Sequence, residues 1–80
     1  MITKLIYFAN KLQLTSKTED DVLIFINNSI GQQIGITKQK LNKGNNSIDL
    51  DINKGFYIIN IYSEKYKYLT SIKIMVKGEF

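Results

Sequence analysis

Hydroxyls, carboxylates and lysines are the side chains that could do chemistry, because the sequence contains no histidine and no cysteine. Their absence removes the usual general base, the usual thiol nucleophile and the common zinc ligands. A serine nucleophile would need an unusual partner such as lysine. Ser71 and Lys73 would share one face of a strand, but no sharp turn exposes the serine. We therefore expect no enzymatic activity and no cofactor.

Two groups of carboxylates are candidates for a cation site. Residues 19–21 are three consecutive acids, and Asp49 and Asp51 would point to the same face of a strand. Together with loop carbonyls, the second pair would suit calcium. However, the chain has no Asp-x-Asp-x-Asp-Gly loop, and an exposed polar face is the simpler interpretation. The sequence therefore predicts no metal site.

Tyrosines alternate with lysines in the last third of the chain, at Tyr57, Tyr62, Lys65, Tyr66, Lys67 and Tyr68. Such an arrangement on strands can stack the bases of single-stranded nucleic acid. However, Tyr57 is in phase with the apolar face and Tyr66 falls in a turn. The net charge is +4, but all 11 basic residues are lysines spread along the chain, with no arginine for bidentate contacts. We predict a solvated lysine-rich surface and no nucleic-acid partner.

Alternation of apolar and polar residues predicts the elements that carry these side chains. No helical periodicity is present, and isoleucine dominates the apolar residues, which favours strands. Short strands separated by turn signals indicate an all-β sandwich or small barrel. Seven strands are predicted, at residues 2–8, 11–16, 21–28, 32–38, 47–52, 56–63 and 68–77.

Four finer predictions follow from the same pattern. Segment 21–28 is apolar on both faces and should lie centrally in a sheet. Gly35 indicates a bulge or a close backbone approach, and residues 41–46 are predicted to form a loop. In the last strand, Lys73 and Lys77 should point outward, opposite an inward row of isoleucine and valine.

The ends of the chain complete the predicted organisation. Residues 1–77 are interpreted as a single domain, and residues 78–80 as a tail that is either native or a cloning remnant. No apolar run approaches the roughly 20 residues of a membrane span, and the first residues do not form a signal peptide.

Three stretches in order, residues 22–34, 41–50 and 54–77, carry a family resemblance. Their order resembles the type A C-terminal sorting domain of cargo proteins of the Bacteroidetes type IX secretion system. The resemblance implies an immunoglobulin-like antiparallel β-sandwich of about seven short strands, at the C-terminus of a longer exported protein. It also implies transit through the periplasm, passage across the outer membrane, and release or display at the cell surface. A sortase usually removes such a domain.

The resemblance supplies the candidate recognition residues. They match a glycine-plus-polar turn, a Gly-x-Tyr strand entry and the lysines of the final strand. By this carry-over they are Gly31, Gln32, Gly55, Tyr57, Lys73 and Lys77. The chain departs from the family at residues 7–10, which read Tyr-Phe-Ala-Asn where many members have Tyr-Pro-Asn-Pro, and at Asn27, where an aromatic residue is expected.

The implied partners are the type IX translocon and its sortase components, with transient outer-membrane association through the translocon. The alternative function is an adhesive or carbohydrate-binding accessory module that stays attached to its parent. A sorting domain must be the last domain of its parent reading frame, whereas an adhesive module need not be. We expect a monomer, or a weak dimer formed through an edge strand such as the final one.

Overall fold

The computed structural model describes residues 2–65 and 67–77, which form seven strands and no helix that could cross a membrane. The predicted all-β fold is confirmed. The tail predicted at residues 78–80 and the turn predicted at Tyr66 lie outside the described residues. The strands are β1 (Ile2–Phe8), β2 (Lys11–Ser16), β3 (Asp20–Asn28), β4 (Gln33–Leu41), β5 (Gly44–Asp49), β6 (Gly55–Ser63) and β7 (Tyr68–Val76).

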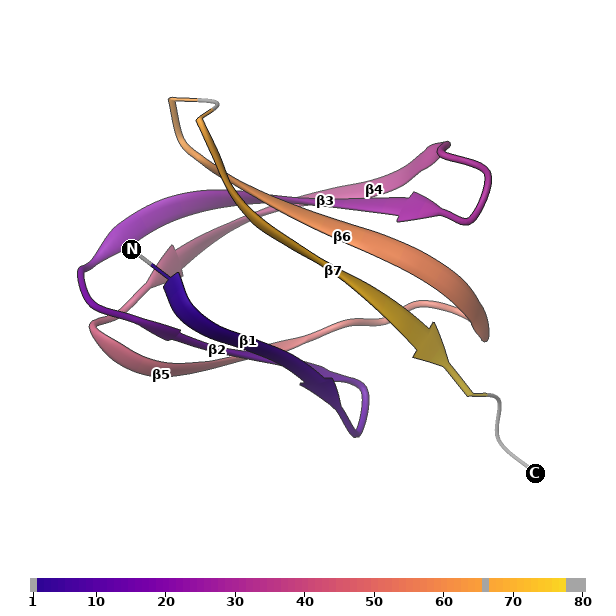
Figure 1. Cartoon of the computed structure of the whole chain (residues 1–80), viewed down its shortest axis with the longest axis horizontal. Coiled ribbons are helices and arrows are strands. Elements are labelled where there is room, and N and C mark those ends of the chain that lie inside the picture. The colour runs from indigo at the N-terminus through magenta and orange to yellow at the C-terminus, as the bar shows by residue number, and fades with distance from the viewer. Residues whose placement is uncertain (1, 66, 78–80) are drawn as a thin grey trace.

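The strands form two antiparallel sheets that pack face to face (Figure 1). One sheet has the order β1-β2-β5 and the other the order β4-β3-β6-β7, so the chain changes sheet three times, after β2, β4 and β5. Immunoglobulin-like domains place their first, second and fifth strands in one sheet, and their third, sixth and seventh in the other. Here the fourth strand joins the second sheet, as in variable-type domains. The expected immunoglobulin-like sandwich is therefore present.

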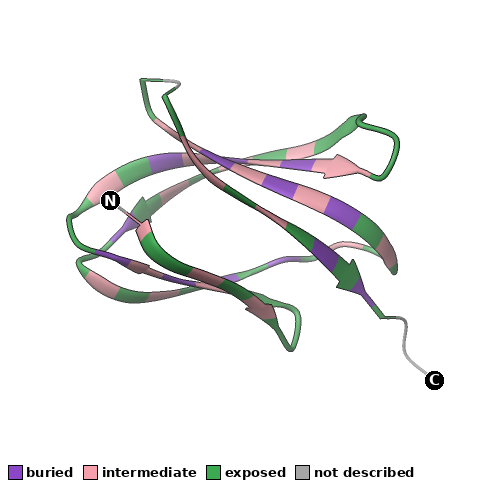
Figure 2. Ribbon diagram, viewed as in Figure 1, coloured by how far each residue is buried: buried purple, intermediate pink, exposed green. Residues whose placement is uncertain are grey.

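The core lies between the two sheets, and alternate residues of β2, β3 and β6 and of the end of β7 supply most of it (Figure 2). Isoleucine suits these positions because its branched side chain packs well on a pleated surface. Segment 21–28 occupies the predicted central position, since β3 has β4 on one side and β6 on the other. Fully burying one such side chain stabilises the fold by about 1.5–3 kcal/mol. The most buried apolar residues are Leu12, Val22, Ile24, Leu41, Ile59 and Ile61.

Two tight turns fix the strand register. Ala9 and Asn10 both have positive φ, 53° and 63°, as the two-residue turn of a type I′ hairpin requires. At the β3–β4 turn, the Asn28 side-chain oxygen accepts a hydrogen bond from the backbone N–H of Gln32 at 2.9 Å. Gly31 has φ of 87° in this turn, a conformation that glycine adopts without steric cost.

The predicted loop at residues 41–46 is wrong in most of its length. β4 continues to Leu41, and β5 already begins at Gly44. The Asn46 side chain accepts a hydrogen bond from the N–H of Asn42 and donates one to its carbonyl, both at 2.9 Å. This closes the reversal within a few residues, so Asn45 and Asn46, which are predicted to lie in the loop, pair with β2 instead.

The other end of β5 also differs from the prediction. The strand stops at Asp49, and the next N–H, that of Leu50, donates to the carbonyl of Asn10 at 3.1 Å. Leu50 still reaches the core. Asp51 lies outside the strand, so the expectation that it shares a strand face with Asp49 is wrong.

Gly35 behaves as predicted. The pairing of β3 with β4 shifts register between Ile26 and Asn27, next to this glycine. A β-carbon at Gly35 would lie 3.6 Å from the Ile26 Cδ1 atom, an ordinary van der Waals contact, so the glycine marks a bulge and not a close backbone approach.

Candidate recognition surfaces

The predicted recognition residues gather at one end of the four-stranded sheet. There, Asn28 of β3 pairs with Tyr57 of β6, which in turn pairs with Ile74 of β7. Gly31 and Gln32 follow in the β3–β4 turn. Gly55 begins β6, Lys73 lies in the second half of β7, and Lys77 directly follows that strand. We call this region, where β3 and β7 end and β4 and β6 begin, the turn end of the sheet (Figure 1).

Two of these residues stabilise the fold and offer little to a partner. Tyr57 is buried, and its hydroxyl donates a 2.7 Å hydrogen bond to the carbonyl of Asn53, four residues upstream. This arrangement is the tyrosine corner of immunoglobulin-like domains. Gly55 has φ of 150°, and a β-carbon there would lie 3.5 Å from the Tyr57 ring. The Gly-x-Tyr pattern therefore builds the β5–β6 crossover.

Lys73 on β7 and Lys77 directly after it lie at an edge of the four-stranded sheet. β7 pairs with β6 alone among the described strands. Lys73 and Lys77 are exposed and alternate with Ile74 and Val76, which are buried. The predicted inward and outward rows of the last strand are therefore confirmed. This edge offers unpaired backbone groups beside two positive charges.

Four apolar side chains at the turn end are exposed, and one of them, Met75, falls between Lys73 and Lys77 in the outward row predicted for the last strand. Ile30 is 77% exposed, Ile34 50%, Phe56 64% and Met75 48%. Phe56 and Met75 are direct cross-strand partners, and we call these two residues the apolar end patch. Single exposed apolar residues such as Ile30 and Ile34 are ordinary, but adjacent ones mark an interaction surface. The sequence signals for the patch are that β6 is apolar on both faces and that Met75 falls in the outward row of β7.

Aromatic side chains form a second cluster on the same sheet, toward the end where β6 stops and β7 begins. The rings of Phe25 and Tyr62 lie 5.3 Å apart, and those of Tyr62 and Tyr68 lie 5.6 Å apart, both edge to face. Such pairs stabilise a sheet by about 0.5–1.5 kcal/mol beyond area burial. The rings contact one another, so Tyr62 and Tyr68 form a cross-strand ladder of the sheet.

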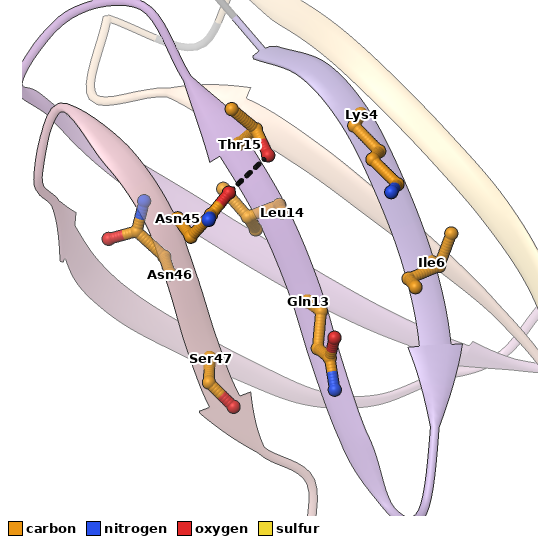
Figure 3. A pocket seen from close by; sticks show the side chains of 8 residues that line it. All are labelled: Lys4, Ile6, Gln13, Leu14, Thr15, Asn45, Asn46 and Ser47. Atoms are coloured by element: carbon orange, nitrogen blue, oxygen red, sulfur yellow. Dashed lines mark hydrogen bonds between the residues drawn. The ribbon is translucent and has the colours of Figure 1, made fainter.

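The outer face of the three-stranded sheet is polar, unlike that of the four-stranded sheet. It contains a shallow hollow of about 420 Å³. Figure 3 shows that Lys4 and Ile6 of β1 lie on one side of β2, and Asn45 and Ser47 of β5 on the other. The Thr15 hydroxyl donates to the Asn45 side-chain oxygen at 2.8 Å (Figure 3), and Gln13 lies beside this pair on β2. Amides, hydroxyls and one ammonium group therefore surround a small apolar contact.

One exposed ion pair accompanies each sheet. Lys11 and Asp49 lie 3.1 Å apart on the three-stranded sheet, and Lys38 and Glu64 lie 2.9 Å apart at the four-stranded sheet. The hydrogen bond between Lys38 and Glu64, reinforced by their charges, raises the pKa of Lys38 and lowers that of Glu64. In the three-stranded sheet, partial burial raises the pKa of Tyr7.

No group of three or more potential metal ligands lies together in the described part of the chain. No protein-family model matches the chain, and no curated protein matches it.

Proposed function

We propose that this chain is a non-catalytic sorting domain, of the type that the type IX secretion machinery recognises at the C-terminus of its cargo. The observation that carries the proposal is the turn end of the four-stranded sheet. There, the residues matched to the family motifs lie beside the apolar end patch and the open edge of β7. A translocon component would bind this end, and a sortase would afterwards remove the domain.

The chemistry of the turn end suits protein recognition. An added strand would satisfy the free backbone groups of β7, while Met75 and Phe56 would enter apolar pockets of the receptor. Lys73 and Lys77 would pair with carboxylates at the rim of that contact, where charges steer binding and exclude wrong partners. Of the six family-matched residues, these two lysines contact the receptor in this proposal, whereas Tyr57 and Gly55 hold the surface in shape.

A reporter fused upstream of this domain tests the proposal in a type IX-competent host. Deleting residues 68–77 removes β7, and we expect the fused reporter to remain in the periplasm. Normal surface display of that truncated fusion would contradict the proposal. Because the deletion also removes Ile74 and Val76 from the core, substitutions at exposed positions are needed to separate recognition from folding.

A second candidate function is carbohydrate binding by a module that stays attached to its parent, and the polar hollow of Figure 3 favours it. Amide and hydroxyl groups such as those of Gln13 and Ser47 suit the hydroxyls of a sugar ring, and Ile6 offers a small apolar contact. Calorimetric titration with oligosaccharides tests this candidate. Heat of binding that disappears in Gln13→Ala, with Phe56→Gln unchanged, would favour it over sorting.

A further inference from the structure

β4 is an edge strand whose inward side chains are only partly covered by the core. It pairs with β3 alone among the described strands. Its inward positions Gly35, Thr37 and Gln39 are only half-buried, and only Leu41 at its end is buried. The outer side of this nine-residue strand therefore presents unpaired N–H and C=O groups to solvent. Such an edge accepts another strand unless its side chains prevent it.

The outward side chains of β4 are apolar in the first half of the strand and positively charged in the second half. Ile34 and Ile36 are 50% and 52% exposed, whereas Lys38 and Lys40 follow on the other side of Thr37. If two copies of the strand pair antiparallel with Thr37 at the centre, each isoleucine of one copy therefore lies opposite a lysine of the other. The strand is complementary to an antiparallel copy of itself.

We infer that a second copy of this chain adds to this edge, with the two β4 strands antiparallel and Thr37 of each copy at the two-fold axis. Ile36 then lies opposite Lys38 of the second copy, and Ile34 opposite Lys40. The aliphatic stems of the lysines cover the isoleucines, while the Lys38 ammonium group keeps its ion pair with Glu64 and that of Lys40 stays in water. The contact is isologous, which is the commonest symmetry of dimers.

The side chains also select this register over its neighbours. Pairing centred on Lys38 would place two ammonium groups directly opposite each other, which is destabilising. Pairing centred on Ile36 would leave the last two residues of β4 without partners. A slip by one residue would turn the two cores to opposite faces of the joined sheet. Centring on Thr37 uses the whole strand and opposes no like charges.

Pairing between copies is less favourable at β7, the edge strand that the sequence suggests for a weak dimer. β7 lies alongside β1 of the other sheet, whereas the main packing partner of β4 is β3. The dimer edge is therefore β4, and β7 takes no part in the contact between copies.

Two substitutions at one position test the inference by changing association in opposite directions. Ile36→Lys places like charges opposite Lys38 in both halves of the dimer, and we expect at least about tenfold weaker association, or about 1.4 kcal/mol. Ile36→Glu creates two cross-strand Glu–Lys pairs, and we expect association at low salt to be at least as tight as in the wild type. Ile6→Lys, on the outer face of the other sheet, is the matched control and should leave association unchanged.

Sedimentation equilibrium over a wide concentration range, with circular dichroism to confirm folding, measures these effects. Added salt should tighten the wild-type dimer, because each copy carries a net charge of +4, and should weaken the Ile36→Glu dimer. Amide exchange should slow at residues 35–39 as concentration rises, but not in β7. A wild-type chain that stays monomeric at high concentration would overturn the inference. So would equal weakening by both variants, or concentration-dependent protection confined to β7.

Discussion

The outer faces of the two sheets differ, although both cover the same core. The three-stranded sheet presents residues such as Gln13, Thr15 and Ser47 to water, as a solvated β-sheet does. The four-stranded sheet instead presents the aromatic ladder and the apolar end patch. Alternation alone explains the first face. The second face leaves apolar surface in water, which is the mark of a surface that a partner covers.

The largest expected effect is the loss in free energy of unfolding when a core residue is truncated. It tests whether the two sheets share one core. Ile59 is fully buried at the centre of β6, so Ile59→Ala should lower the free energy of unfolding by about 2–5 kcal/mol. Urea denaturation measures this loss. Ile6→Ala is the control, because Ile6 is exposed on the polar face and should change stability by only about 0.5 kcal/mol. Equal effects at the two positions would contradict the assignment of the core.

The next effect compares the central strands of the two outer faces directly. Phe25→Thr removes the edge-to-face contact with Tyr62 together with part-buried apolar surface, and should cost about 1–2 kcal/mol. Gln13→Thr makes the same replacement on β2 and should stay within about 0.5 kcal/mol of the wild type. Thermal unfolding of the pair measures the difference. Similar costs would mean that the ladder adds nothing beyond strand propensity.

A smaller effect concerns the corner that supports the turn end. Tyr57→Phe keeps the ring but removes the hydrogen bond to the carbonyl of Asn53, which should cost about 0.5–1.5 kcal/mol. Gly55→Ala should destabilise as well, because its φ of 150° is unfavourable for a residue with a β-carbon. Tyr62→Phe, which keeps the ladder, serves as a control. Unchanged stability of Tyr57→Phe would show that the hydrogen bond of the tyrosine corner does not stabilise the fold.

The smallest effect is the pH dependence of the ion pair at the four-stranded sheet. The pKa of Glu64 is lowered by Lys38, so the carboxylate favours the folded state at neutral pH. This contribution is lost as the pH falls from the ordinary carboxyl value through the lowered pKa of Glu64. Both groups are exposed, so the loss should be slight. Acid titration of the wild type against Glu64→Gln measures it, and a stability gap that widens toward low pH would contradict the assignment.

Local pattern predicted most of the fold, because strand phase depends on near neighbours. The inward row of β7 and the burial of Tyr57 followed from alternation alone. The start of β5 was missed because a side-chain bridge from Asn46 to the backbone of Asn42 closes the turn early, which strand propensity does not encode. The polar hollow was missed because its lining comes from three strands brought together by the topology. The exposure of Ile30 depends on the path of one turn and has no signature in the pattern.

Surface display of a fused reporter that carries substitutions on one outer face at a time is the most direct measurement of the central claim. Phe56→Gln with Met75→Gln changes two exposed side chains of the apolar end patch, and Gln13→Ala with Ser47→Ala changes the polar face. The folded state of each purified domain is confirmed first by its unfolding transition. We predict that the first pair abolishes display and that the second leaves it normal. Normal display of the first pair, or loss only with the second, would contradict recognition through the turn end of the four-stranded sheet.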